Sequence, residues 1–250
     1  MAYYYFYVEG IKYPPTIRLL FGDLIHQILE IYFRNKVEGE TLECSLLEDL
    51  FVKYLDEMIT TVRWVDGENH ESEVSFYKEK GIKLIRKFYP LIETLKPIEV
   101  EKLMHIPIID GGFEITIKPD LIIEDGVIDF KTKQRKTTPD FNQLLLYSLG
   151  YKQLMGKYPR HLTFINLIYT KKQEKIDVVS IDGHPKGHPD LLIKEVKTVL
   201  DSIQRGIYFP APPNSWQCSP EYCDYFEICP YGKRRQDSFV EIEPVIKVEE

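Results

Sequence analysis

Two carboxylates and a lysine lie close together in the middle of the chain, in a segment that is otherwise apolar. Asp129 and Lys131 are two residues apart, and strand side chains alternate between faces, so both point the same way. Asp120 lies on the preceding strand and can come opposite them. Charges on one sheet face are costly to bury without partners. Because carboxylate oxygens suit Mg²⁺ or Mn²⁺, the pattern predicts a divalent-metal site.

A helix predicted after this segment presents two further polar side chains. Thr138 is a suitable N-cap and Pro139 suits the first helical position, and the helical pattern continues to about Met155. Gln143 and Tyr147 are four residues apart and therefore share one face of this helix. We expect that face to lie beside the acidic side chains.

The strands that carry the acids are predicted from composition and turn signals. Phe113–Ile123 is rich in β-branched and aromatic residues, Glu124–Gly126 is a turn signal, and Val127–Phe130 is a second apolar run, so these residues predict a hairpin. Pro97–Pro107 is predicted as the first core strand, and a Gly-Gly turn at 111–112 leads into the hairpin.

The rest of the chain supplies helices and two more strands. The apolar spacing predicts an amphipathic helix from Thr16 to about Asn35. Further elements are predicted as helices over 45–62, 72–95 and Pro189–Gln204, and as strands over His161–Tyr169 and Lys175–Ile181. This order of helices, three strands, helix, two strands and helix predicts an α/β fold with a mixed-sheet core and an N-terminal helical insertion.

The ordered motifs Pro119-Asp120, Asp129-Phe130-Lys131 and Gln143-xxx-Tyr147 resemble the PD-(D/E)XK nuclease superfamily. The last motif narrows the resemblance to the RecB-type exonuclease branch, with the RecB and AddB nuclease domains and CRISPR-associated, viral and phage exonucleases. A lone D-x-K is a weak signal, whereas the ordered set is more specific. The alternative is a solvated hairpin with surface acids and a basic turn.

The resemblance implies a restriction-endonuclease-like fold and metal-dependent hydrolysis of DNA. We expect one nuclease domain over residues 1–250, with a helical part over 16–95, an α/β catalytic core over 97–204 and a cysteine-rich segment over 208–235 that packs back on the core. Lys131 would orient or help deprotonate the attacking water, and Gln143 and Tyr147 would position the DNA strand and the nucleophile.

A histidine on the first predicted helix belongs to the same resemblance. The pattern Gly22-xxx-His26 resembles the first motif of RecB-type nucleases, which implies that His26 is a metal ligand. The implied set is then His26, Asp120, Asp129 and the backbone carbonyl of Phe130. Imidazole suits Mn²⁺ better than Mg²⁺. The alternative is a partly buried histidine that pairs with a polar neighbour.

Charge and composition limit the class of protein. The net charge of −7 argues against broad, nonspecific coating of nucleic acid, but a local basic strip can still serve one channel. Such a strip is formed by Lys131, Lys133, Arg135 and Lys136, and a second by Lys233, Arg234 and Arg235. We expect a DNA partner with single-stranded ends. No apolar run approaches the ~20 residues that span a membrane, and no leader opens the chain, so we expect a cytoplasmic protein.

Three of the four cysteines are clustered near the C-terminus, at Cys218, Cys223 and Cys229. Clustered thiols in a cytosolic protein indicate metal more than disulfide. The resemblance implies a 4Fe–4S cluster whose fourth ligand lies near the N-terminus, where only the aromatic run 3–7 is found. The spacing C-x4-C-x5-C departs from the family's frequent C-x2-C. Zinc, or buried thiols beside Trp216 and Tyr225, are the alternatives.

The fourth ligand is the open point of the cluster hypothesis. Cys44 is the remaining thiol, and it follows the His26 helix, which is not the family position. We therefore expect the reading frame to extend upstream of Met1 and to include a cysteine there.

The alternative to an active nuclease is a catalytically inactive DNA-binding or DNA-repair and recombination accessory protein on the same fold. A second alternative is a metal-dependent hydrolase with another substrate.

Overall fold

The computed structural model describes residues 1–64, 69–108, 112–137, 140–184, 188–212, 215, 217–220 and 222–232. The chain divides into two compact units, Pro14–Lys197 and Met1–Tyr13 with Thr198–Glu250. The predicted single domain over residues 1–250 stays a prediction. Among the described helices, none combines the length and apolar character that a membrane crossing requires.

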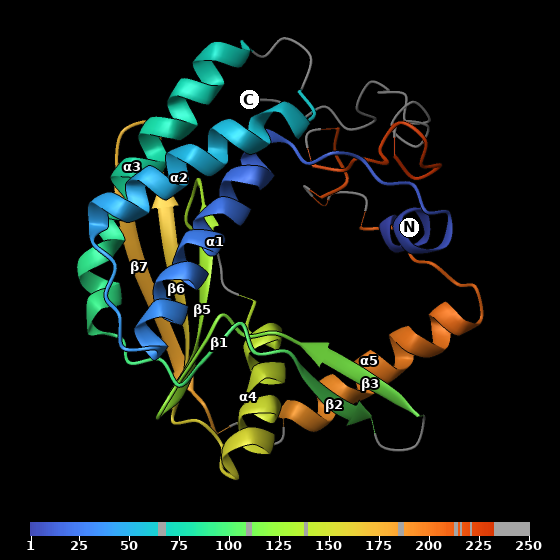
Figure 1. Cartoon of the computed structure of the whole chain (residues 1–250). Helices are drawn as coiled ribbons and strands as arrows, with labels where there is room; N and C mark the ends of the chain where they lie inside the picture. The colour runs from blue at the N-terminus through green and yellow to red at the C-terminus, as the bar shows by residue number, and fades with distance from the viewer. Residues whose placement is uncertain are drawn as a thin grey trace, which may run out of the picture. The chain divides into compact units, whose positions relative to one another are not determined.

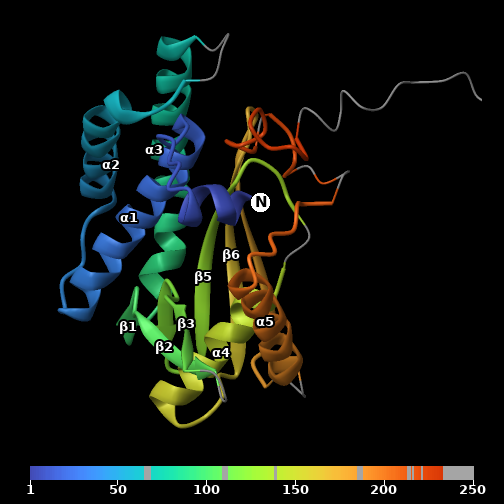
Figure 2. The same cartoon turned by 90° about the vertical axis from the view of Figure 1, so that its right-hand side faces the viewer.

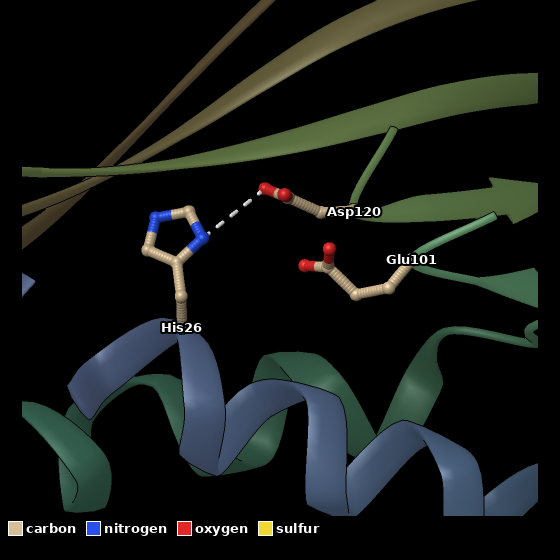
Figure 3. Close-up of side chains that lie close together, drawn as sticks. All are labelled: His26, Glu101 and Asp120. Carbon is tan, nitrogen blue, oxygen red and sulfur yellow. Dashed lines mark ion pairs between the residues drawn. The ribbon is translucent and has the colours of Figure 1, made fainter. Parts of the chain in front are cut away.

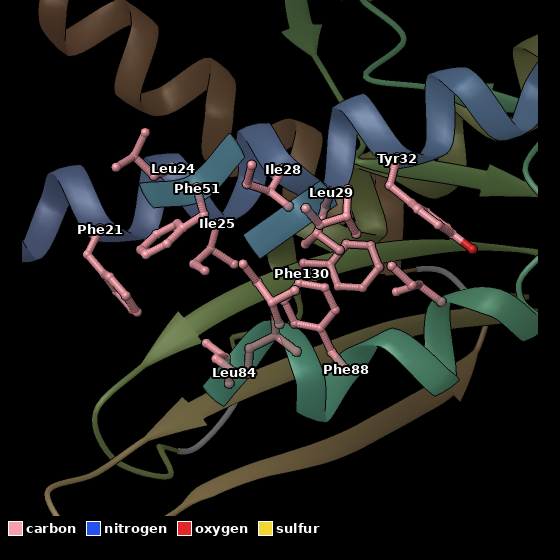
Figure 4. Packing of buried hydrophobic residues seen from close by; sticks show 14 of the residues in the cluster. Phe21, Leu24, Ile25, Ile28, Leu29, Tyr32, Phe51, Leu84, Phe88 and Phe130 are labelled. Carbon is pink, nitrogen blue, oxygen red and sulfur yellow. The ribbon is translucent and has the colours of Figure 1, made fainter. Parts of the chain in front are cut away.

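Three helices form one layer of the larger unit: α1 (Ile17–Val37), α2 (Cys44–Met58) and α3 (His70–Thr94), with the short 3-10 turn η2 (Ile59–Thr61) between the last two. Apolar residues of α1 recur every three or four positions and are buried, which confirms the predicted amphipathic helix. Figure 4 shows them packed against Phe51 of α2 and Phe88 of α3, with Phe130 reaching in from the sheet.

The sheet of the larger unit has five strands in the order β1-β4-β5-β6-β7. Their bounds are β1 (Glu99–Val100), β4 (Leu121–Ile123), β5 (Gly126–Lys133), β6 (His161–Tyr169) and β7 (Glu174–Asp182). Strands β5 and β6 are parallel, whereas the other neighbours are antiparallel. Helix α4 (Asn142–Met155) connects the parallel pair, as a parallel connection requires. The predicted mixed-sheet α/β fold, of restriction-endonuclease type, is confirmed.

Two helical layers enclose the sheet. Helices α1–α3 lie on one side, and α4 lies on the other, against β5 and β6 (Figures 1 and 2). A separate two-stranded sheet, β2 (Met104–Ile108) with β3 (Phe113–Ile117), packs against α4. The last helix, α5 (His188–Gln204), runs across the boundary between the two units.

Two predicted strands are wrong because each divides between two sheets. The predicted strand Phe113–Ile123 is β3 and β4, which separate at 118–120, where Pro119 has no N–H for a ladder. The predicted strand Pro97–Pro107 is β1 and β2, which separate after Glu101, whose φ of 49° lies in the left-handed region. The hairpin turn at 124–126 and the strands over 161–169 and 175–181 are confirmed.

The α4 helix begins later than predicted. Its first residue is Asn142, whose N–H donates to Asp140 Oδ1 at 3.0 Å. The expected N-cap Thr138 and the expected first residue Pro139 lie outside the described residues. The helix ends as predicted at Met155, and Gly156 follows with a φ of 71°, a conformation that glycine adopts at little cost.

The described part of the smaller unit contains the π-helical turn η1 (Tyr4–Val8) and the last residues of α5. It also contains a small core in which the Tyr5 and Tyr225 rings stack at 5.2 Å beside Cys229. Tyr225 donates a hydrogen bond to Ile11 O at 2.9 Å. The N-terminal aromatic run is only partly buried, since the exposed fraction of Tyr7 is 68%.

Candidate active site

Asp120 lies where strands β1, β4 and β5 meet. The β4–β5 register pairs Leu121 with Ile128, so Asp120 comes opposite Asp129 just before the start of β4. Its Oδ2 accepts a 2.6 Å hydrogen bond from Phe130 N, and its backbone oxygen accepts one from Glu101 N at 3.0 Å. The Asp120 carboxylate therefore accepts the Phe130 N–H at the point where β4 begins.

Asp129 and Lys131 form an ion pair on one face of β5. The Asp129 side chain is almost completely buried, and its Oδ2 lies 2.8 Å from Lys131 Nζ. The same ammonium group donates to Gln143 Oε1 at 2.8 Å and lies 5.7 Å from the centre of the Phe164 ring. The lysine is thus held between the sheet and α4.

Helix α4 contributes a short chain of hydrogen bonds to this lysine. Gln143 Nε2 donates to the Tyr147 hydroxyl at 2.7 Å, and that hydroxyl donates to Lys118 O at 3.2 Å. The two side chains lie one turn apart on the face that the four-residue spacing predicts. Burial, with the nearby Asp129 and Asp120 carboxylates, raises the pKa of Tyr147 strongly, so its phenol stays neutral.

A second group of side chains lies on the α1 side of Asp120 (Figure 3). His26 from α1, Glu101 after β1 and Asp120 before β4 each offer one ligand atom, and these three atoms lie within 4.8 Å of one another. His26 Nδ1 lies 3.5 Å from Asp120 Oδ2. They border a cavity of about 10 Å³, which is close to the space of one water-sized sphere.

The carboxylates of the site carry more negative charge than their partners offset. Burial, and then the neighbouring Asp120, raise the pKa of Asp129 to about 6. Burial also raises the pKa of Glu101, although Lys118 forms an ion pair with it. Burial alone would lower the pKa of His26, but the Asp120 and Asp129 carboxylates outweigh it and the pKa is raised.

These properties fit a divalent cation. Asp129 Oδ2 and Glu101 Oε2 are buried, and among the described residues their partners are the ammonium groups of Lys131 and Lys118. Two carboxylates and an imidazole form a donor set that Mn²⁺ and other divalent metals accept. Asp129 is not one of the three residues within 4.8 Å, yet its charge helps to raise the pKa of His26, and the charge of Asp120 helps to raise the pKa of Asp129. The predicted roles of Asp129 and of the Phe130 carbonyl as ligands stay predictions.

Glu101 is a site residue that the sequence analysis missed. The sequence predicts one continuous strand over Pro97–Pro107, whereas the chain turns at Glu101 with its left-handed φ and directs the carboxylate toward Asp120. The available signal was the pair of acids at Glu99 and Glu101. An acid at alternate positions of a predicted core strand is unusual and needs a partner.

The predicted basic strip begins within the last residues of β5 and continues past its end. Lys133 Nζ donates to Thr137 Oγ1 at 3.0 Å, Lys136 Nζ pairs with Asp177 Oδ1 at 2.8 Å, and Arg135 is exposed. Burial, and then Lys131, lower the pKa of Lys133. The second strip, residues 233–235, lies outside the described residues.

The cysteines do not form a four-thiolate site in the part of the chain that the structure describes. Cys218, Cys223 and Cys229 are free thiols that border a cavity of about 540 Å³ in the smaller unit. They are not a group whose ligand atoms lie within 4.8 Å. Cys44 belongs to the larger unit, where its thiol donates to Glu48 Oε1 at 3.5 Å. Trp216 lies outside the described residues.

Comparison with known proteins gives a family match over most of the chain. The family model of the PD-(D/E)XK nuclease superfamily matches residues 1–230. No curated protein matches the chain. Among solved structures, a candidate exonuclease from Eubacterium rectale is 14% identical, with 87% of this chain and 84% of that chain covered and a TM-score of 0.43. SSO0001 is 21% identical, with 72% and 93% covered and a TM-score of 0.37.

Proposed function

This chain belongs to the PD-(D/E)XK nuclease superfamily, and on that premise we propose that it is a metal-dependent deoxyribonuclease, an exonuclease of the RecB type. The observation that carries the proposal is the ion pair of the buried Asp129 with Lys131, beside the His26, Glu101 and Asp120 cluster. A degraded, non-catalytic site would have no reason to keep three carboxylates, an imidazole and an ammonium together at the cost of their burial.

The metal would be held by His26, Glu101 and Asp120, with Asp129 and the Phe130 carbonyl as further ligands. Mg²⁺ and Mn²⁺ are the candidates, and the imidazole favours Mn²⁺. Bound there, the cation would lower the pKa of a coordinated water and offset charge on the attacked phosphate.

Lys131 acts on the phosphate and the attacking water. Its ammonium group is kept in place by Asp129 and Gln143, each at 2.8 Å. A fixed positive charge there stabilises the charge that develops in the transition state. Gln143 is in turn oriented by Tyr147, whose neutral hydroxyl is anchored on Lys118 O. The pair therefore positions Lys131 rather than taking up a proton.

DNA would reach the site along the basic strip of Lys133, Arg135 and Lys136. Cations that follow the catalytic strand would contact the phosphates on one side of the cut. The Gln143-xxx-Tyr147 motif supports the RecB-type assignment, and with it a preference for single-stranded ends. A 4Fe–4S cluster on Cys218, Cys223 and Cys229 stays a prediction, since three thiols are one fewer than such a cluster takes. Visible absorbance of anaerobically purified protein tests it.

The proposal is tested with linear and circular single-stranded DNA, linear duplex DNA and RNA, in Mg²⁺, Mn²⁺ or EDTA. We expect metal-dependent loss of nucleotides from linear single strands, and intact circles. Lys131→Ala should lower the rate by about 10²- to 10⁴-fold with DNA affinity nearly unchanged. Lys172→Ala, which removes an exposed lysine from the β6–β7 turn, is the matched control.

Four outcomes contradict separate parts of the proposal. Wild-type cleavage by Lys131→Ala removes the assigned role of the lysine. Cleavage of circles makes the protein an endonuclease. If the protein binds DNA but cleaves none with either metal, the alternative of a DNA-binding accessory protein is supported. Cleavage of RNA alone changes the substrate class.

A further inference from the structure

A cavity of about 480 Å³ lies in the larger unit, bordered by the beginning of α3 and by the ends of β5 and β6. Its volume falls within the range of about 300–1,000 Å³ that is typical of small-molecule sites. None of its described lining residues belongs to the proposed metal ligands or to the group around Lys131. The cavity is therefore a separate feature that needs its own explanation.

The position of the cavity in the sheet is one where ligands bind. Strands β5 and β6 run side by side in the same direction (Figure 1). Gln134 directly follows β5 and Thr170 directly follows β6, and both residues border the cavity. In sheets of this kind, ligands bind outside the carboxyl ends of parallel strands. The topology therefore indicates a ligand site here.

The apolar wall of the cavity is aromatic. Tyr77 and Tyr169 are buried with their ring centres 6.1 Å apart, and the half-buried Phe76 packs edge-to-face against Tyr77 at 5.2 Å. Burial, and then Tyr77, raise the pKa of Tyr169 strongly, so its phenol stays neutral. Neutral aromatic side chains provide stacking surfaces for the flat rings of nucleobases.

The polar side chains around the cavity favour a neutral ring over a phosphate. Gln134 is exposed, and its Nε2 donates to the Tyr77 hydroxyl at 3.3 Å. Among the described lining residues the charged ones are Glu73 and Lys171, which have opposite signs. A phosphate would meet a carboxylate here, whereas amide and hydroxyl groups can form hydrogen bonds with the edge of a base.

The cavity is close to the proposed active site along β5. Gln134 lies three residues beyond Lys131, which is about 10 Å along an extended chain. Lys133 and Arg135, the residues on either side of Gln134, belong to the basic strip. A DNA strand whose phosphates follow the strip would therefore pass the mouth of the cavity.

Helix α1 links the cavity to the metal ligands on the same side of the sheet. The Phe21 ring lies 4.6 Å from the Tyr169 ring and 5.2 Å from the Tyr77 ring. His26 lies five residues further along α1, about 7.5 Å along the helix axis. The aromatic wall and the proposed metal site are thus held at a fixed separation by one helix.

We propose that this cavity is a nucleobase subsite, which holds one base of the DNA strand by stacking on Phe76 and by hydrogen bonding to Gln134; this inference rests on the proposed function. The phosphates stay outside, on the basic strip. A base held at a fixed distance from His26 determines which phosphodiester bond of the strand lies at the metal.

Binding of a short, fluorescently labelled single-stranded oligonucleotide, measured by anisotropy in EDTA at low salt, tests the stacking. Phe76→Ala should weaken binding by about 5- to 150-fold. Phe76→Leu, which keeps an apolar side chain but no ring, should also weaken it, whereas Phe76→Trp should bind like the wild type. Wild-type affinity in both Phe76→Ala and Phe76→Leu overturns the inference.

Tyr54→Ala is the matched control for Phe76→Ala. Tyr54 is also a half-buried aromatic residue on a helix with a lysine over its ring, at 6.0 Å compared with 5.6 Å for Phe76, but it does not line the cavity. Its replacement should leave the affinity unchanged. If Phe76→Ala does not fold, Gln134→Ala replaces it, since this exposed side chain can be removed with little effect on packing. It should weaken binding by about 2- to 12-fold.

A scan with abasic sites locates the base. Oligonucleotides that each lack one base should bind the wild type with a loss of affinity that is largest at one position. In Phe76→Ala or Gln134→Ala that position should lose much of its effect, because the variant and the abasic site remove the same contact. A scan that neither variant changes overturns the inference.

Because binding is measured without metal, this test is independent of cleavage. A protein that cleaves DNA but gives a scan that the variants do not change keeps the proposed function and loses the subsite. A protein that cleaves no DNA, yet loses the peak of the scan in Phe76→Ala, keeps the subsite and loses the proposed function.

Discussion

Replacing Asp129 by asparagine should make the metal-free protein more stable while it abolishes activity. The carboxyl group is buried on β5, and its pKa rises from 3.8 to about 6, first because of burial and then because of Asp120. Each pH unit corresponds to about 1.4 kcal/mol, so holding Asp129 ionised costs the folded state about 3 kcal/mol at neutral pH.

The sign of the pH dependence follows from this raised pKa. The folded state binds the proton more tightly than the unfolded chain, so the stability that neutral Asp129 contributes is fully present below pH 3.8 and is lost as the pH rises to about 6. Asparagine resembles the neutral acid at every pH. The variant and the wild type should therefore be equally stable near pH 4 and differ by about 3 kcal/mol at pH 7.5.

Urea unfolding in EDTA, at intervals from pH 4 to pH 7.5, measures this difference. Comparing the two proteins at each pH removes the contribution of the other acids, which titrate in both. Adding Mn²⁺ at pH 7.5 should stabilise the wild type by mass action and the variant much less. If the variant is as stable as the wild type at pH 7.5, or less stable, then Lys131 already offsets the charge of the buried Asp129 carboxylate. The inference that the metal-free site lacks a cation would then be refuted.

Three further predictions concern other residues of the larger unit. His26→Ala should raise the Mn²⁺ concentration that gives the half-maximal rate and should change the free energy of unfolding little; an unchanged Mn²⁺ concentration would return His26 to a structural role. Tyr147→Phe should lower kcat about tenfold, because the hydroxyl that orients the α4 amide is lost; wild-type kcat would contradict this. Gly81→Ala should destabilise the protein by about 1–3 kcal/mol in urea unfolding, since a Cβ would lie 2.1 Å from the Phe51 ring. Gly22→Ala, where nothing lies within 4 Å, is its control and should be neutral or stabilising by up to about 1 kcal/mol; equal effects would contradict the packing argument.

Local patterns predicted most of the elements that carry the site. The α1 helix follows from its apolar spacing, and β6 begins and ends where the flanking polar segments predict. The shared face of Asp129 and Lys131 follows from strand alternation alone. In each case the information lies within a few neighbouring residues, and the local preference agrees with the fold.

The missing parts depend on contacts between distant segments. Pro119 signals a break in the strand, but no local signal shows which sheet each side of it joins, or that Glu101 N pairs with Asp120 O. The left-handed turn at Glu101 costs energy on its own and is maintained by this tertiary contact.

The 2.6 Å hydrogen bond from Phe130 N to Asp120 Oδ2 makes one backbone amide a reporter for the site. A carboxylate that shares its charge with a cation is a weaker acceptor, so the Phe130 amide proton should change its chemical shift and its rate of exchange with solvent when a metal binds. The signal comes from the backbone of a buried residue and needs no substrate, dye or introduced label. Occupancy of the metal site, and competition between Mg²⁺ and Mn²⁺ for it, can thus be followed by titration in protein that is not turning over.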